Sequence, residues 1–182
     1  MEQVVLARSV VAVYEMASDE VQGVGRETGA VAQFMFEEHG KGVYLHKARG
    51  ENAIQTSSYV GSRMQLHCTA LGKAILSQFP REQVGEIIDQ TGLPRHTANT
   101  ITNPEELFAE LDTVREQNVA FDDEEVVKGL RCVAAPVTAG DRAAAISVSG
   151  PTSRFKGDRF HETLAELIRD AANVIEVNAV QV

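Results

Sequence analysis

Hydrophobic residues are unevenly distributed along the chain, and the two ends differ from the middle. Residues 4–16 (VVLARSVVAVYEM) form an apolar stretch without a glycine or a capping residue, which favours a helix that packs against another surface. A second helix is predicted over residues 18–28, because Ser18 can cap it, acidic residues follow in its first turn, and Gly29 ends it. Beyond Gly29 the spacing of apolar residues changes from helical to alternating.

The alternating region predicts strands. Residues 30–47 are expected to form a β-hairpin with its turn at the GKG sequence of residues 40–42. The apolar residues on one side of the first strand are Ala32, Phe34 and Phe36. Residues 53–59 follow a glycine break and are expected to form a further strand.

Helical spacing returns in the middle of the chain. Two helices are predicted over residues 69–79 and 80–92, and a third within residues 102–118 (TNPEELFAELDTVREQN). The third has the clearest local signal, since Asn103 can cap it and Pro104 suits the first helical position. Each of the three presents an apolar face that needs cover.

The rest of the chain alternates between strands and one long helix. The predicted elements are a short strand at 119–121, an acidic turn at 122–125, two apolar strands at 130–137 and 142–149 joined by a turn at 138–141, and a helix at about 158–178. Strands and helices thus occur in mixed runs rather than in strict β-α-β alternation. The pattern therefore predicts an α+β fold with a central antiparallel sheet flanked by helices.

Composition and charge narrow the function classes. A chain of 182 residues suits one domain. No apolar run reaches the ~18 to 20 residues of a membrane span, and Glu2 and Arg8 interrupt the region where a signal peptide keeps its apolar centre. We therefore expect a cytoplasmic protein with no membrane partner. The net charge of -9 provides no basic surface for a phosphate backbone, so these residues alone should not bind DNA.

Neither catalysis nor metal binding is expected. His67 precedes Cys68, and Arg131 precedes Cys132, which suggests a thiol beside a base or a cation. Sequence neighbours in a strand point to opposite faces, however, and those at a helix start diverge, so neither pair has nucleophile and base geometry. The five histidines and two cysteines show no HxxxH or CxxC spacing. We expect structural thiols, no metal site and no cofactor.

Four segments occur in order along the chain: LHCTALGKAIL (66–76), TANTITNPEEL (97–107), GLRCVAAPV (129–137) and ISVSGPTSRF (146–155). In this order and spacing they resemble the effector-binding domain of the IclR family of transcriptional regulators. The resemblance runs from about residue 17 to the C-terminus and implies a GAF-like sensor fold. It also implies that residues 1–16 are the remnant of a linker helix. Family members carry an N-terminal winged helix-turn-helix, and nothing in these residues resembles it, so DNA binding would belong to that absent module.

The resemblance directs attention to a pocket. Backbone amides at Ala70 and Leu71, where a helix begins, suit a carboxylate. Ser147 and Ser149 alternate with Ile146 and Val148 on a strand, so both hydroxyls share the opposite face and can hydrogen-bond an oxyanion. The neighbouring strand offers an apolar wall with a weak thiol donor, and an acidic residue at the mouth can accept from a ligand hydroxyl. Those residues are Leu130, Cys132 and Asp122.

In the resembled family, effector contacts fall at the positions that match these seven residues, and the resemblance assigns effector binding to each. They are Ala70, Leu71, Asp122, Leu130, Cys132, Ser147 and Ser149. Taken singly, a serine or cysteine here could equally be a core residue, and Asp122 a turn acid. A small organic acid is the expected ligand, although some relatives bind aromatic acids or lactones.

A second interpretation is a dimerisation module that binds no ligand. The family associates as dimers or as dimers of dimers, and the apolar N-terminal stretch would leave a large surface exposed on a lone domain. The residues behind that expectation are Val4, Val5, Val10, Val11 and Val13. The pocket separates the two interpretations, because a sensor needs a semi-polar cavity and a scaffold has the same atoms packed shut.

Overall fold

The computed structural model describes residues 2–179, and it describes side chains from residue 12 onward except at position 139. The helices are α1 (Glu2–Thr28), α2 (Ala70–Leu76), α3 (Arg81–Thr91), α4 (Pro104–Gln117) and α5 (Leu164–Ala179), with a π-helical turn η1 (Arg159–Thr163) ahead of α5. The strands are β1 (Val31–Glu38), β2 (Lys41–Arg49), β3 (Arg63–Gln65), β4 (Ala120–Asp123), β5 (Leu130–Ala139) and β6 (Arg142–Pro151). Among the described helices, none combines the length and the apolar character that crossing a membrane requires.

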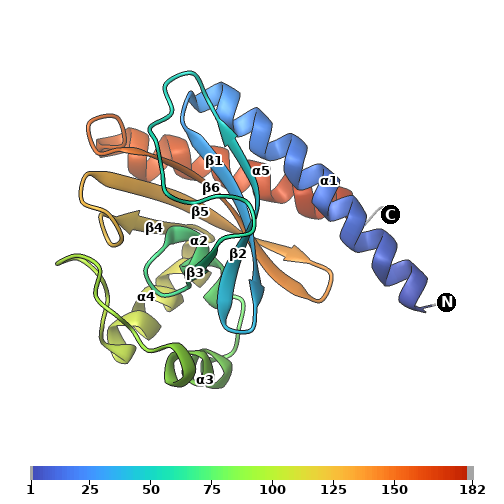
Figure 1. Ribbon diagram of the computed structural model, residues 1–182, viewed down its shortest axis with the longest axis horizontal. Helices are drawn as coiled ribbons and strands as arrows, with labels where there is room; N and C mark the ends of the chain where they lie inside the picture. The colour runs from blue at the N-terminus through green and yellow to red at the C-terminus, as the bar shows by residue number, and fades with distance from the viewer. Residues whose placement is uncertain (1, 180–182) are drawn as a thin grey trace.

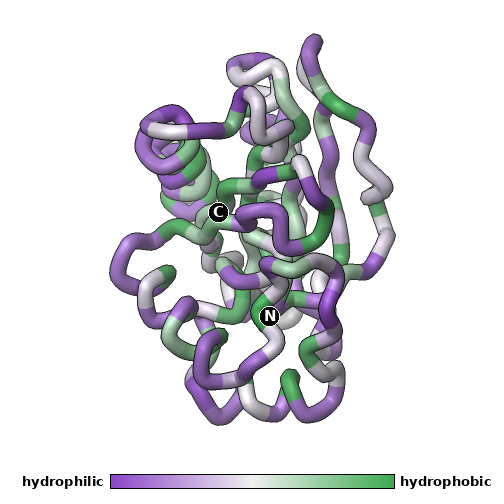
Figure 2. The backbone as a smooth tube through the Cα atoms, turned by 90° about the vertical axis from the view of Figure 1, so that its left-hand side faces the viewer, coloured by the Kyte–Doolittle hydropathy of each residue, from purple (hydrophilic) through white to green (hydrophobic). Residues whose placement is uncertain are grey.

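The strands form one sheet in the order β3-β2-β1-β6-β5-β4, and every neighbouring pair is antiparallel. Helices α1 and α5 lie together on one face, and α2, α3 and α4 lie on the other (Figure 1). Figure 2 shows that the outer turns are largely hydrophilic, while hydrophobic stretches lie toward the middle. The molecule is therefore an α+β fold with a central antiparallel sheet, as the pattern predicts.

Alternation along each central strand supplies two cores. Phe34, Ile146 and Val148 face α1 and α5 and belong to the first buried cluster. Met35 and Ala145 point the other way, toward α2 and α4, and belong to the second. Because side chains alternate between faces, the residues beside Ile146 and Val148 must point into the second layer, which is where the pocket lies.

The N-terminal region differs from the sequence prediction. The two helices expected at 4–16 and 18–28 are one continuous helix, α1. Ser18 does not cap a helix; its hydroxyl instead accepts a hydrogen bond from Gln22 Nε2 one turn later, at 3.5 Å. A serine inside a helix costs only a few tenths of a kcal/mol, roughly, which packing of Ala17 against the sheet offsets.

The valines behind the expected exposed surface fall into two groups. Val13 is buried in the first cluster, so that part of the expectation is wrong, because α1 packs Val13 on its own domain. The side chains of Val4, Val5, Val10 and Val11 lie outside the described residues. Tyr14, on the same helix, is 46% exposed.

The first hairpin is confirmed, but its turn lies at residues 39–40 rather than at 40–42, because Lys41 and Gly42 already pair with β1. The strand predicted after the hairpin is wrong. Strands β1 and β2 pair antiparallel, and the chain reverses at His39 and Gly40, which both have positive φ. Residues 53–59 form a loop rather than a strand. The backbone of this loop does not pair with a strand of the sheet. Its serine and threonine side chains instead hydrogen-bond to residues of the sheet; for example, Lys47 Nζ donates to Thr56 Oγ1 at 2.7 Å.

The predicted helices of the middle region are all present. Thr69 caps α2, since its Oγ1 accepts from the Gly72 amide at 2.9 Å, and Asn103 Oδ1 caps α4 by accepting from the amides of the first turn. A side chain at Gly72 would place its Cβ 2.1 Å from the carbonyl oxygen of Leu66. Glycine there lets α2 lie close against the chain that leads into it.

The C-terminal elements follow the prediction in type and order, with changes of boundary. Strand β5 continues to Ala139 and β6 to Pro151, so the predicted turn at 138–141 is shorter than expected. The acidic turn predicted at 122–125 begins only at Glu124, whose φ is 60°, because Asp122 and Asp123 continue β4 and pair with β5. The predicted helix at 158–178 begins with the π-helical turn η1 and continues as α5.

Candidate ligand-binding pocket

A cavity of about 680 Å³ lies on the α2 side of the sheet. It is bounded by the start of α2, by all six strands, by the loop over residues 54–59, and by the connection between β4 and β5. All seven residues singled out from the sequence line this one cavity: Ala70, Leu71, Asp122, Leu130, Cys132, Ser147 and Ser149. Their role in binding a ligand stays a prediction.

Strand register explains why residues so far apart in sequence meet. Asp122 on β4 pairs with Cys132 on β5, which pairs with Ser149 on β6. The three side chains therefore form one row across three strands. Ser147 lies two residues along β6, where it pairs with Gln33 of β1, and both line the cavity.

The two serines differ in their partners. Ser149 Oγ donates to Cys132 Sγ at 2.9 Å. Ser147 is 1% exposed, and its Oγ has no hydrogen-bond partner among the described residues. Leaving a buried hydroxyl without a partner costs roughly 1–3 kcal/mol, so such groups are uncommon in folded proteins. An unpartnered hydroxyl that faces a cavity is a group available to a ligand.

Asp122 lies deeper than the sequence suggests. It was expected at the mouth of the pocket, but its exposed fraction is 2%, because β4 carries it beneath the connection to β5. Burial raises the pKa of Asp122 from its ordinary 3.8 to about 7. The backbone amide of Glu125, which donates to Oδ1 at 2.7 Å, works in the opposite direction. Near neutral pH this carboxyl can therefore hold or lose a proton.

The thiols are unsuited to nucleophilic chemistry. Burial raises the pKa of Cys132 well above its ordinary range and that of Cys68 to about 12, so both remain protonated. His67 does not face the thiol of Cys68, since its Nε2 lies 3.0 Å from the carbonyl oxygen of Pro94. Among the side chains that the structure describes, no group of three or more His, Cys, Asp or Glu is placed to hold a metal ion.

Several cavity residues were not anticipated from the sequence. Residues 53–59 were expected to form a strand; they form a loop instead, and residues 54–59 of that loop line the cavity. Gln33 could have been noticed, because it is a polar residue in an apolar alternating strand; it is 5% exposed and donates from Nε2 to Ser58 Oγ at 2.6 Å. Tyr44 on β2 also lines the cavity, and nothing in its local sequence indicates that.

Comparison with known proteins identifies the class of domain. The sequence model of the family described as bacterial transcriptional regulator IclR, C-terminal, matches residues 5–177. The HTH-type transcriptional regulator KdgR of Dickeya chrysanthemi is 42% identical over 134 residues, which are 72% of this chain and 44% of that protein. The chain thus spans less than half the length of that relative.

Solved structures agree with this assignment. The crystal structure of the C-terminal domain of Escherichia coli KdgR superimposes with a TM-score of 0.82 at 31% identity, covering 92% of this chain and 98% of that one. The inducer-binding domain of a PobR double mutant from Acinetobacter, in complex with 3-hydroxybenzoic acid, gives a TM-score of 0.79 at 25% identity, covering 89% and 96%.

Two expectations are confirmed by these relatives. IclR C-terminal domains have a GAF-like fold, which is the fold the sequence resemblance implies. The relatives are transcriptional regulators and not enzymes, in agreement with the inert thiols. The chain belongs to the IclR family of bacterial transcriptional regulators, of which it matches the C-terminal domain.

Proposed function

We propose that this chain is the effector-binding and oligomerisation domain of an IclR-type regulator, and that its effector is a small organic or aromatic acid. The unpartnered hydroxyl of Ser147 carries the proposal, because it is buried, lines the cavity and is free to donate to a ligand oxygen. Ala70 and Leu71 line the same cavity at the start of α2, and the first amides of a helix have no partner inside the helix.

The size and lining of the cavity support a ligand of this class. A volume of about 680 Å³ lies within the range of small-molecule sites and leaves room for an aromatic ring. Leu71 and Leu130 supply apolar walls beside the hydroxyls. The related PobR domain holds 3-hydroxybenzoic acid, which combines a carboxylate with a ring.

A thermal-shift screen tests the proposal. The probes are pyruvate, benzoate and 3-hydroxybenzoate, with benzamide as the uncharged control. A ligand at a hundred times its dissociation constant stabilises the folded state by ~2.7 kcal/mol. We expect a carboxylate to raise the melting temperature of the wild type more than benzamide does, and to raise that of Ser147→Ala less. Equal responses in the two proteins would contradict the role of Ser147.

The alternative, a dimerisation module without a ligand, predicts that the pocket atoms are packed shut. The open cavity and the unpartnered Ser147 hydroxyl favour the sensor over the scaffold. Self-association remains part of the proposal, with a dimer or tetramer as the expected state. Val174 and Val177 on α5 are 41% and 52% exposed and could contribute to such a contact. Light scattering at micromolar concentration should give at least a dimer, and a monomer of 19.8 kDa would contradict it.

We also propose a division of labour within the full-length regulator. DNA binding would reside in an N-terminal winged helix-turn-helix outside these 182 residues, and residues 1–16 would belong to the linker helix that joins it to this domain. The absence of any basic cluster in this acidic sequence fits that division. A regulator of this family acts on genomic DNA, so we place it in the cytoplasm.

A further inference from the structure

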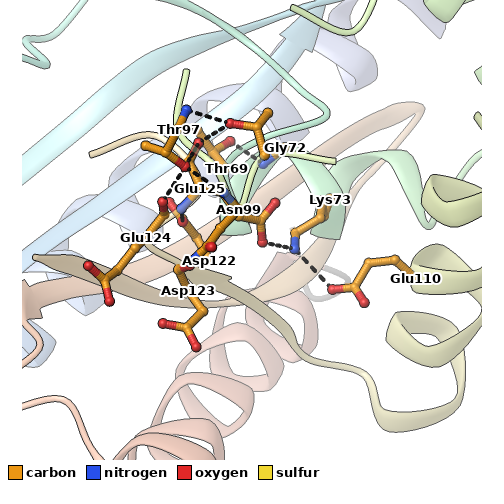
Figure 3. Close-up of polar contacts among 11 residues, drawn as sticks. Thr69, Gly72, Lys73, Thr97, Asn99, Glu110, Asp122, Asp123, Glu124 and Glu125 are labelled. Atoms are coloured by element: carbon orange, nitrogen blue, oxygen red, sulfur yellow. Dashed lines mark hydrogen bonds and ion pairs between the residues drawn. The ribbon is translucent and has the colours of Figure 1, made fainter. Parts of the chain in front are cut away.

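A buried lysine lies directly behind the pocket. Lys73 is one turn along α2 from the cavity residues Ala70 and Leu71, and it is 1% exposed. Its Nζ lies 2.6 Å from Glu125 Oε1 and 2.9 Å from Glu110 Oε1 (Figure 3). Burial alone would lower the pKa of Lys73, but the two carboxylates outweigh it and raise that pKa. Lys73 is therefore a charged residue that joins α2, α4 and the connection between β4 and β5.

The Glu125 end of this network belongs to a wall of the pocket. The β4–β5 connection comprises residues 124–129, and positions 126–129 line the cavity. The backbone amide of Glu125 donates to Asp122 Oδ1 at 2.7 Å. Glu125 thus binds Lys73 through its side chain and Asp122 through its backbone amide. Lys73 itself does not line the cavity, so it reaches the pocket only through Glu125.

Glu125 depends on Lys73 for its buried charge. Its exposed fraction is 6%, and among the described residues Lys73 is the one cation paired with it. The second carboxylate oxygen, Oε2, is buried and has no partner in the described part of the chain. Removing the partner of a buried charge is strongly destabilising, because the remaining ion must take up a proton or move to water. Movement of Glu125 would displace its amide from Asp122.

A second set of contacts holds the same connection from the other side. Thr97 Oγ1 donates to the carbonyl oxygen of Glu124 at 2.6 Å (Figure 3). Thr100 Oγ1 donates to the carbonyl oxygen of Glu125 at 2.6 Å. These neutral hydrogen bonds do not depend on Lys73. They define the competing hypothesis, in which the threonines suffice to place the connection and the ion pair only stabilises the fold.

We propose that Lys73 is a positioning residue for the pocket: through its ion pair with Glu125 it fixes the β4–β5 connection, and through the Glu125 amide it fixes the Asp122 carboxyl. This role does not rest on the proposed ligand, since it concerns the pocket without one. Lys73 and Glu125 would act as a unit, and Glu110, which binds the same lysine from α4, would not share the role.

Amide hydrogen exchange measured by NMR on the 182-residue chain tests the positioning. In Lys73→Met and in Glu125→Gln, we expect the amide of residue 125 to exchange faster, on the order of tenfold or more, relative to the core amide of Val133. Glu110→Gln is the matched control, because it removes the other carboxylate from Lys73 and leaves the pair with Glu125 intact. It should leave the residue-125 amide as protected as in the wild type.

The Asp122 titration is a second readout, because the direction in which its pKa moves separates a positioning role from a merely structural one. Its midpoint is followed through the Asp122 carboxyl carbon resonance. The groups that face this carboxyl are Tyr44, Cys68, Lys73, Glu125 and Cys132. Glu125→Gln removes a like charge, which alone would lower the Asp122 pKa from its wild-type value of about 7. On our proposal the variant also moves the residue-125 amide away from Asp122 Oδ1, and losing that larger effect raises the pKa, so the Asp122 pKa should not fall. A merely structural ion pair leaves the amide in place and predicts a fall. Glu110→Gln should leave the Asp122 pKa unchanged.

The outcomes separate the two hypotheses. If Lys73→Met does not fold, Glu125→Gln carries the test alone, since glutamine keeps the shape of the side chain. Selective exchange at residue 125 in Glu125→Gln, with an Asp122 pKa at or above its wild-type value, supports the proposal, and a lowered Asp122 pKa in that variant contradicts it. The proposal is overturned if exchange at the residue-125 amide and at the Val133 amide speeds up equally, or if neither exchange rate changes. It is also overturned if Glu110→Gln has the same effects as Glu125→Gln, because the ion pair with Glu125 would then not position the pocket.

Discussion

The hydroxyl of Ser149 donates a hydrogen bond to the sulfur of Cys132 across the paired strands β6 and β5, with Oγ and Sγ 2.9 Å apart. A thiol sulfur is a weak acceptor, so this hydroxyl can be recruited by a better one. The Ser147 hydroxyl, two residues away on the same face, has no hydrogen-bond partner in the part of the chain that the structure describes. Both serines can donate a hydrogen bond to a ligand. Ser149 must first break its hydrogen bond to Cys132, whereas Ser147 breaks none.

This difference predicts unequal effects of removing the two hydroxyls. A hydrogen bond to a charged group contributes roughly 1.5–3 kcal/mol, so each alanine substitution should weaken carboxylate binding roughly tenfold to a hundredfold. Ser147→Ala should have the larger effect, because Ser149 must first break its bond to Cys132. Titration calorimetry with 3-hydroxybenzoate measures both. Wild-type affinity in two folded variants would show that the ligand sits elsewhere.

The raised pKa of Asp122 predicts that anion binding depends on pH. Below a pKa of about 7 the carboxyl is neutral, and above it a negative charge faces the ligand carboxylate. The affinity for benzoate should therefore fall as pH rises from 6 to 8, at most about tenfold per unit above the pKa. Asp122→Asn is neutral throughout and should show a flat profile. A wild-type profile as flat as that of the variant would count against a titrating Asp122 beside the ligand.

The same carboxyl should affect stability, with a sign that follows from the shift. The folded state binds the Asp122 proton more tightly than the unfolded chain, whose carboxyl titrates near 3.8. The free energy of unfolding should therefore decline between about pH 4 and pH 7 through this group. Asp122→Asn removes that decline. Urea denaturation should therefore show the free energy of unfolding of the variant increasing relative to that of the wild type as pH rises across this range. A constant difference between the two proteins would contradict the shift.

The acidic composition predicts that these residues do not bind duplex DNA at physiological salt. Counterion release requires clustered lysine and arginine, and the chain has 17 basic against 26 acidic residues. A mobility-shift assay with duplex DNA should show free DNA at micromolar protein. Salt-sensitive retardation of the duplex by the 182-residue chain would contradict this prediction.

Local signals predicted much of the fold because they act over a few residues. The cap at Asn103 followed by Pro104 is a contact between chain neighbours, and the structure contains it. The shared face of Ser147 and Ser149 follows from strand alternation alone. Both features depend on geometry that the sequence contains within a single element.

Other features depend on partners distant in sequence, and they were missed for that reason. The loop at 54–59 looks like a strand, yet Lys47 and Gln33 hold its side chains and the loop covers the pocket. Lys73 and Glu125 are 52 residues apart, so neither residue's neighbours indicate the ion pair. The depth of Asp122 likewise arises from the packing of the connection above β4 and not from its acidic neighbours.

The central claim is that a carboxylate binds in this pocket, and an NMR titration of the amide resonances with 3-hydroxybenzoate tests it most directly. We predict that the Ala70 and Leu71 amides shift with a common single-site curve, together with those of the cavity-lining residues 126–130. Resonances on the far face of the sheet, over α1 and α5, should stay in place. Saturable binding that leaves Ala70 and Leu71 unmoved while shifting residues on that far face would contradict the account.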